Sequence, residues 1–151
     1  MFLTDQKEAA LNAVLVALQH AADHYAQSVE LLENQPASDF FARLLHLRRS
    51  AAVQVTEILR SLDFLPTDPD PDRLSLSELA TRVKAALVPE VSPILEHKAL
   101  QLESQIEDQL VSALSIEWPE QVAKTLGRLL NETRTEIKRV QTLERRGSKA
   151  G

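Results

Sequence analysis

The stretch "DFLPTDPDPDR", residues 63–73, decides the fold because it is the clearest interruption in a chain that otherwise reads as helix. Pro66, Pro69 and Pro71 fall within six residues. A proline inside a helix removes a hydrogen bond and clashes with the preceding turn, so no helix is expected to continue through this stretch. The break lies between the second and third of four long segments that show helical periodicity.

Those four segments cover residues 4–34, 38–63, 93–116 and 119–146. In each of them apolar residues recur three and four positions apart, which is typical of helices that bury one face. The turn "NQPASD", residues 34–39, is short and predicts that the first two helices are antiparallel neighbours. The first segment illustrates the stripe, which consists of Leu11, Val14, Leu18, Ala22, Tyr25, Val29 and Leu32.

The long connection after residue 63 contains a short helical pattern of its own. Ser75 and Glu78 match a capping box at the start of residues 75–87. A four-helix bundle with one long crossover between its second and third helices has the ferritin-like arrangement. We therefore predict an all-α, antiparallel, ferritin-like bundle with a short fifth helix in the crossover. The domain is expected to span residues 1–146, with Gly147 ending the last helix and 147–151 forming a flexible tail.

Composition and charge exclude several classes of function. The 151 residues include no cysteine, which rules out disulfides, thiolate metal sites and cysteine nucleophiles. The net charge of −5 argues against a protein built to bind nucleic acid. The apolar run "AVLVAL", residues 13–18, is too short to span a bilayer, and no basic leader precedes it. These features predict a cytoplasmic protein that does not bind membranes.

Three stretches carry a resemblance to a known family. "LNAVLVALQHAADHYAQSVE" (11–30), "SLSELATRVKAALV" (75–88) and "PEQVAKTLGRLLNE" (119–132) resemble small bacterial stand-alone four-helix bundles, an uncharacterised branch of the ferritin-like superfamily. The resemblance implies a pair of iron or manganese ions in the bundle core. Proteins with that centre draw one Glu from each of two helices and a Glu-x-x-His motif from each of the other two.

The ligand pattern that the resemblance implies is incomplete in this chain. Acidic residues stand at matching positions in three helices, namely Asp23, Glu103, and Glu132 followed by Glu136, but Gln54 occupies the comparable place in the second helix. None of the four histidines, His20, His24, His46 and His97, has Glu three residues before it. We therefore expect no dinuclear site, no catalytic residue and no cofactor. The alternative is iron or manganese bound by non-standard ligands drawn from Asp23, Glu103, Glu132, Glu136 and His46.

Arg48 breaks the apolar stripe of the second helix. Phe41, Leu44, Ala51 and Val55 keep the rhythm, and Arg48 occupies the position between Leu44 and Ala51. One interpretation is that its apolar stem packs while the guanidinium reaches solvent. Another is that it binds an anionic ligand.

In a third interpretation Arg48 pairs inside the bundle with Asp23, Glu103 or Glu132, because buried charges are rare unless they are paired. One cation would then replace the positive charge of the metal among the remaining carboxylates.

Three other features have a functional and a structural interpretation. His20 and His24 share a helix face and could bind a divalent ion, but the wheel position predicts a solvated pair. Asp68, Asp70 and Asp72 follow the start of a Ca²⁺ loop, yet Arg73 and Leu79 replace the required Gly and Glu, so a polar linker is expected. Tyr25 is expected to pack its ring in the core and to find one hydrogen-bond partner.

The function predicted from these features is a non-enzymatic bundle that acts through protein contacts, either as a homodimer or with another partner. The crossover and its apolar residues Phe64, Leu65 and Leu87 are the candidate contact surface. A metal-dependent redox or iron-handling protein is the first alternative. A small-molecule-binding bundle with an apolar cavity is the second.

Overall fold

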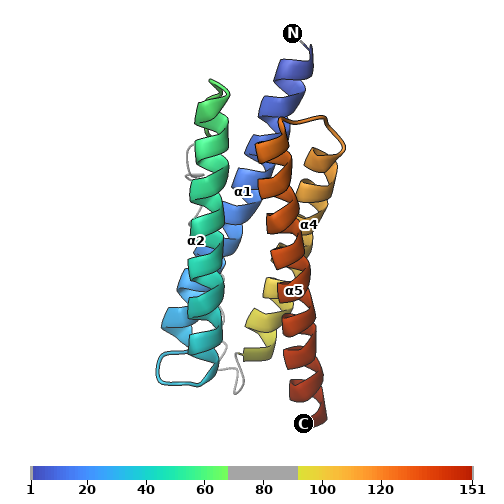
Figure 1. The fold of residues 1–151 in the computed structure, drawn as a ribbon. Helices are drawn as coiled ribbons and strands as arrows, with labels where there is room; N and C mark the ends of the chain where they lie inside the picture. Colours follow the sequence, from blue (N-terminus) through green and yellow to red (C-terminus); the bar gives the residue numbers. More distant parts are fainter. Residues whose placement is uncertain (1, 68–91, 151) are drawn as a thin grey trace.

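The computed structural model describes residues 2–67 and 92–150, and these residues form four helices (Figure 1). The helices are α1 (Phe2–Leu31), α2 (Ala37–Ser61), α4 (Ser92–Leu114) and α5 (Glu120–Ala150). No strand occurs in the described ranges, so the prediction of an all-helical domain is confirmed there. The helix predicted at 75–87, Leu87 and the candidate calcium loop beginning at Asp68 lie outside the described residues.

The four helices lie side by side along one long axis (Figure 1). In this view α1 and α5 run down the page, whereas α2 and α4 run up it. α1 packs against both α2 and α4, and α4 packs against α5. In Figure 1, α2 and α5 lie on the side of the bundle nearest the viewer.

The end of α2 explains how the chain leaves the bundle. Asp63 adopts a left-handed conformation, with φ of 59°, which Asx side chains tolerate better than most others. The Phe64 N–H donates to the carbonyl oxygen of Leu59 at 2.8 Å, and the Asp63 N–H donates to that of Arg60 at 3.1 Å. This pair of bonds is a Schellman motif, which satisfies the last carbonyl groups of the helix.

The Asn12 side chain of α1 binds the residues that follow α2. The Asn12 amide nitrogen donates to the Leu65 carbonyl at 3.1 Å, while its oxygen accepts from the Thr67 N–H and hydroxyl, each at 2.7 Å. Phe64 is partly buried against the core, whereas Leu65 is 79% exposed. Of the predicted contact surface, Leu65 is therefore accessible and Phe64 is largely occupied by packing.

The core is wider on α1 than the predicted stripe. Five of the seven stripe residues are buried, and Ala22 and Val29 are only partly so. A second stripe, Ala17, Ala21, His24 and Ser28, is also buried. Because α1 contacts two neighbouring helices, its buried arc has to cover both contacts.

The last helix is longer than predicted. α5 continues through Gly147 to Ala150, so the expectation that it ends near Arg146 is wrong. Glycine within a helix costs only about 1 kcal/mol relative to alanine, which does not force a stop. The flexibility of residues 147–151 stays a prediction. Within the described part of the chain, no helix combines the length and the apolar character that crossing a membrane requires.

Candidate functional site

Arg48 turns into the bundle rather than toward solvent. It lies on the buried face of α2 with Leu44 and Ala51, and its exposed fraction is 0%. The interpretation in which its guanidinium reaches solvent is therefore wrong. The same apolar periodicity that buries α2 carries this cation into the core.

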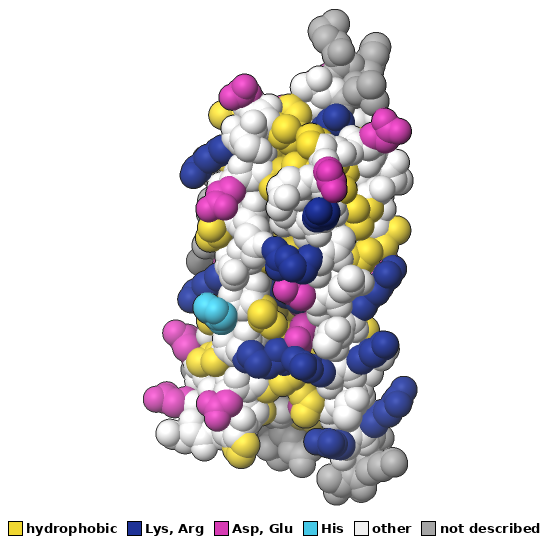
Figure 2. All heavy atoms as spheres, viewed as in Figure 1, with side chains coloured by type: hydrophobic (Ala, Val, Ile, Leu, Met, Phe, Trp, Pro, Cys, Tyr) yellow, Lys and Arg dark blue, Asp and Glu magenta, His cyan; other side chains and the backbone are white. Residues whose placement is uncertain are grey.

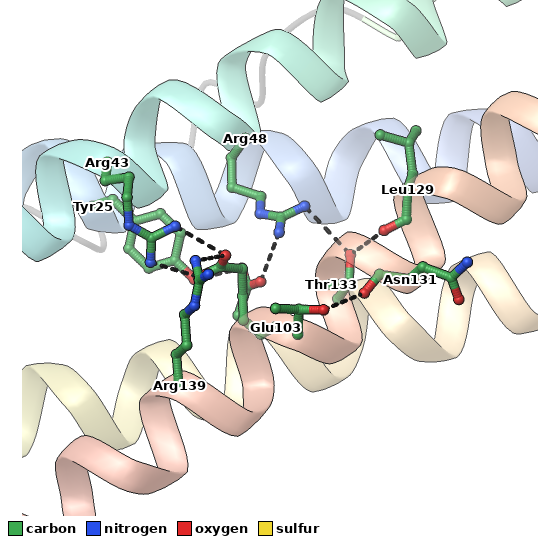
Figure 3. A network of polar contacts seen from close by, with 10 residues as sticks. Tyr25, Arg43, Arg48, Glu103, Leu129, Asn131, Thr133 and Arg139 are labelled. Atoms are coloured by element: carbon green, nitrogen blue, oxygen red, sulfur yellow. Dashed lines mark hydrogen bonds and ion pairs between the residues drawn. The ribbon is translucent and has the colours of Figure 1, made fainter.

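Inside the bundle, Arg48 pairs with Glu103 of α4 (Figure 3). Nη2 of Arg48 lies 2.9 Å from Oε1 of Glu103. The two groups are close but not aligned for a linear hydrogen bond, so the contact is chiefly Coulombic. Of the three carboxylates that the sequence offered as partners for Arg48, Glu103 is the one this ion pair uses.

Tyr25 and Thr133 complete the surroundings of this pair. The Tyr25 hydroxyl donates to Oε2 of Glu103 at 2.6 Å, which confirms the single hydrogen-bond partner predicted for the tyrosine. Nη1 of Arg48 donates to the Thr133 hydroxyl at 3.4 Å, and that hydroxyl donates to the Leu129 carbonyl at 2.7 Å. The four described helices thus each contribute one side chain to what we call the interior cluster: Tyr25, Arg48, Glu103 and Thr133.

Burial perturbs the acid–base behaviour of this cluster. Burial raises the pKa of Glu103 above its ordinary value, and the nearby Arg48 charge and the Tyr25 hydrogen bond only partly oppose that effect. Burial and the adjacent Glu103 raise the pKa of Tyr25 well above its usual range. The tyrosine therefore stays a hydrogen-bond donor at any physiological pH.

A second charged group lies close to the first, at the surface between α2 and α5. Arg43 donates from Nη1 and Nη2 to the two carboxylate oxygens of Glu136 at 2.9 and 2.7 Å. Arg139 donates to the same carboxylate at 2.9 Å. Glu136 is only 3% exposed, and Figure 3 shows the two guanidinium groups meeting from opposite helices. The hydrogen bonds to Glu136 raise the pKa of Arg43.

Glu132 and His46 lie outside the interior cluster. Glu132 pairs with Arg128 at 3.0 Å at the surface, so its predicted place beside Arg48 is wrong. Glu132 is the chain neighbour of Thr133, and successive helix positions point about 100° apart, so only one of the two can face the core. His46 is exposed on α2, and Asp23 is partly buried on α1.

His24 is buried, in contrast to the solvated position predicted for it. It is 3% exposed, and its Nε2 lies 3.2 Å from the Leu95 carbonyl oxygen. That contact requires the tautomer in which Nε2 carries the proton, because the carbonyl can only accept. Burial lowers the pKa of His24 from 6.5 to about 4, although the bond to Leu95 opposes the change. The ring is edge-on to Tyr25 and Phe41.

The donor set does not fit the dinuclear centre that the resemblance implies. Such a centre needs several carboxylate and imidazole groups converging on one point. Among residues 2–67 and 92–150, no group of three or more His, Asp or Glu side chains is arranged to hold a metal ion. Glu103 and Glu136 instead face arginines, and a second cation placed beside Glu103 would be repelled by Arg48.

The sequence did not predict that Arg43 and Arg139 bind Glu136, nor that His24 is buried. Arg43 and Arg139 lie at the edges of their helices, where only the distance between α2 and α5 determines whether they share a carboxylate. No family model matches this chain, and neither the curated proteins nor the solved structures provide a match.

Proposed function

We propose that this chain is an antiparallel, ferritin-like bundle without a dinuclear metal site, and that it acts through protein contacts rather than through catalysis. The observation that carries the proposal is the buried Arg48–Glu103 pair. The proposal includes a short fifth helix in the crossover and a cytoplasmic location, both of which follow from the sequence.

The chemistry of the pair supports a structural role. A buried carboxylate is stable only when a cation and hydrogen-bond donors compensate for its lost hydration. A metal provides that compensation in dinuclear proteins, whereas here Arg48 supplies the cation and Tyr25 the donor. Because an arginine stays protonated, Arg48 holds its positive charge at any physiological pH and, like a resident cation, stays beside Glu103.

Metal loading tests this part of the proposal. Protein purified without chelator is incubated with Fe²⁺ under anaerobic conditions, or with Mn²⁺, then desalted and subjected to elemental analysis. We expect far less than one ion per chain. Stoichiometric binding that is lost in Glu103→Gln would contradict the proposal and favour the metal-dependent redox alternative instead.

Exposed apolar side chains support the protein-contact part. Among the described residues, large hydrophobic side chains that stay exposed are Val53 (57%), Leu65 (79%), Ile94 (40%) and Val111 (47%). Contact with a second copy of the chain would remove such surface from water, with a gain of about 25 cal/mol per Å². Sedimentation equilibrium is expected to reveal a dimer that Leu65→Ser weakens. A monomer at all concentrations would contradict the homodimer and leave a different protein as the partner.

A further inference from the structure

A groove between α2 and α5 is the most distinctive surface feature outside the interior cluster. Its larger section has a volume of about 640 Å³ and lies between Phe40 and Arg43 of α2 and the last turns of α5. A smaller section of about 370 Å³ continues toward Arg128 and shares Arg43, Thr135 and Arg139 with the first. The larger volume is within the range of small-molecule sites, roughly 300–1,000 Å³.

The larger section of the groove is cationic in an acidic protein. Arg43, Lys138, Arg139 and Arg146 line it, and no carboxylate among the described residues does, whereas Glu132 and Glu136 line the smaller section. Figure 2 shows Lys and Arg side chains gathered along this line between the two helices, with hydrophobic and some acidic side chains among them. The chain as a whole carries a net charge of −5, so this concentration of positive charge does not follow from overall composition.

The cations are only partly neutralised by the protein itself. Arg43 and Arg139 share one carboxylate, that of the buried Glu136. Lys138 and Arg146 form no ion pair with the described part of the chain. Like charges focused in a concave surface raise the local concentration of anions.

The other lining residues restrict the class of anion. The hydroxyls of Thr135 and Thr142 donate to carbonyl oxygens of their own helix, at 3.0 and 2.9 Å, so recognition of the head group would rest on the cations. Phe40 and Leu143 supply an apolar wall, and the Arg43 guanidinium lies 5.5 Å from the centre of the Phe40 ring. The wall would favour a ligand that has an apolar body as well as a charge.

We propose that this groove binds a small organic anion in which a phosphate or carboxylate head group is attached to an apolar body. Guanidinium groups recognise both head groups by paired hydrogen bonds. The head group would contact Lys138 and Arg146, which form no ion pair with residues 2–67 and 92–150, and the exposed edge of Arg139, whose side chain is 55% exposed. The apolar body would lie on Phe40 and Leu143. The site does not use Arg48 and is independent of the function proposed above.

Calorimetric titration with octyl phosphate and with octanoate tests the proposal, and the two probes distinguish the head groups. We expect one saturable site per chain for at least one probe. Inorganic phosphate, which lacks the apolar body, and 1-octanol, which lacks the charge, are each expected to bind at least about tenfold more weakly. Equal binding of either comparison compound would overturn the assigned ligand class, and the absence of saturable binding would overturn the site.

Two double variants locate the site. Lys138→Gln with Arg146→Gln removes two groove cations that form no ion pair among the described residues, and it is expected to weaken binding by about tenfold or more. Lys124→Gln with Arg145→Gln makes the same charge change on the same helix outside the groove, and binding is expected to stay within about twofold. Equal weakening by both variants would show attraction to the net charge alone and would overturn the proposal. Thermal unfolding verifies that both variants fold.

A bilayer is the other source of such head groups. The larger section of the groove has a volume that suits one small molecule, so the protein is expected not to sediment with vesicles of phosphatidic acid in phosphatidylcholine. Sedimentation that the groove variant abolishes and the control variant preserves would overturn the assignment to a free ligand.

Discussion

Arg48 of α2 and Glu103 of α4 face each other inside the bundle, with 2.9 Å between Nη2 and Oε1 and with both residues fully excluded from solvent. Removing two charges from water is expensive, and their attraction offsets the cost only when the geometry is good and further polar contacts are made. Tyr25 provides such a contact to the carboxylate. The pair connects helices that are separated in sequence by the long crossover, so it can hold their register.

Replacing Arg48 alone is predicted to be strongly destabilising. Arg48→Met leaves the Glu103 carboxylate buried without its cation, which costs about 3–5 kcal/mol in comparable sites. The measurement is the free energy of unfolding in urea. The double variant Arg48→Met with Glu103→Leu removes both charges and is expected to regain most of the loss. A double variant as unstable as the single one would contradict the pairing.

Removing the Tyr25 hydroxyl is predicted to have a smaller effect. Tyr25→Phe deletes the bond to Oε2 of Glu103, and a hydrogen bond to a charged group contributes about 1.5–3 kcal/mol. Urea unfolding of Tyr25→Phe measures the loss. In a Glu103→Gln background the same change should cost less, because the acceptor no longer carries a charge. An equal cost in both backgrounds would indicate that the hydroxyl acts elsewhere.

The buried His24 predicts a dependence of stability on pH. Its pKa in the folded protein is about 4, against 6.5 for an exposed histidine. Between these values the unfolded chain binds a proton that the folded protein excludes, so stability falls as the pH is lowered from 6.5 to 4. The loss contributed by His24 is about 3 kcal/mol over this window, from about 1.4 kcal/mol per pKa unit.

The variant His24→Gln isolates that contribution. Burial also raises the pKa of Glu103, so above the ordinary pKa of a glutamate the folded protein holds a proton that the unfolded chain has lost. This group therefore increases stability as the pH falls. The effect is the same in wild type and in His24→Gln, so it cancels in the difference between them. The free energy of unfolding of wild type minus that of His24→Gln, measured in urea at a series of pH values, should therefore fall by about 3 kcal/mol between pH 6.5 and pH 4. His20→Gln, at a partly exposed position, is the matched control. A constant difference would mean that His24 titrates normally.

Arg43 and Arg139 are predicted to act redundantly on Glu136. Each arginine contacts the same carboxylate, so either single change to Met leaves one cation in place. The side chains of Arg43 and Arg139 are 38% and 55% exposed, and each single change is expected to cost about 1 kcal/mol or less. The double change leaves Glu136 buried and unpaired, so its cost should exceed the sum of the single changes, as a double-mutant cycle in urea would measure. Simple additivity would contradict the shared contact.

Much of the fold was predictable because apolar spacing and proline placement act locally. The stripe of α2 predicted that Arg48 would lie on a buried face. Few carboxylates lie near the apolar stripes of the other helices, so only three candidate partners had to be considered. The choice of Glu103 over Glu132 was not predictable, since it depends on the rotation of α4 and α5 about their axes. A shift of one residue along a helix moves a side chain by about 100°, and stripe analysis cannot resolve neighbouring positions that finely.

His24 and the Arg43–Glu136 contact depended on packing between helices. The prediction for His24 assumed that α1 buries a single narrow stripe. α1 in fact contacts α2 and α4, so the small residues Ala17, Ala21 and Ser28 form a second buried line that includes His24. The spacing of these small residues was the one available signal. Arg43 and Glu136 are separated by most of the chain, and nothing local predicts that they meet.

The central claim is that a protein cation, and not a metal, neutralises the carboxylate in the bundle interior. Its most direct test is the urea midpoint of wild type in excess Mn²⁺, in anaerobic Fe²⁺ and in EDTA. A metal that binds the folded state at 100 times its dissociation constant would add about 2.7 kcal/mol of stability. We predict the same midpoint in all three conditions. A midpoint that rises with either metal and falls in EDTA would contradict the claim.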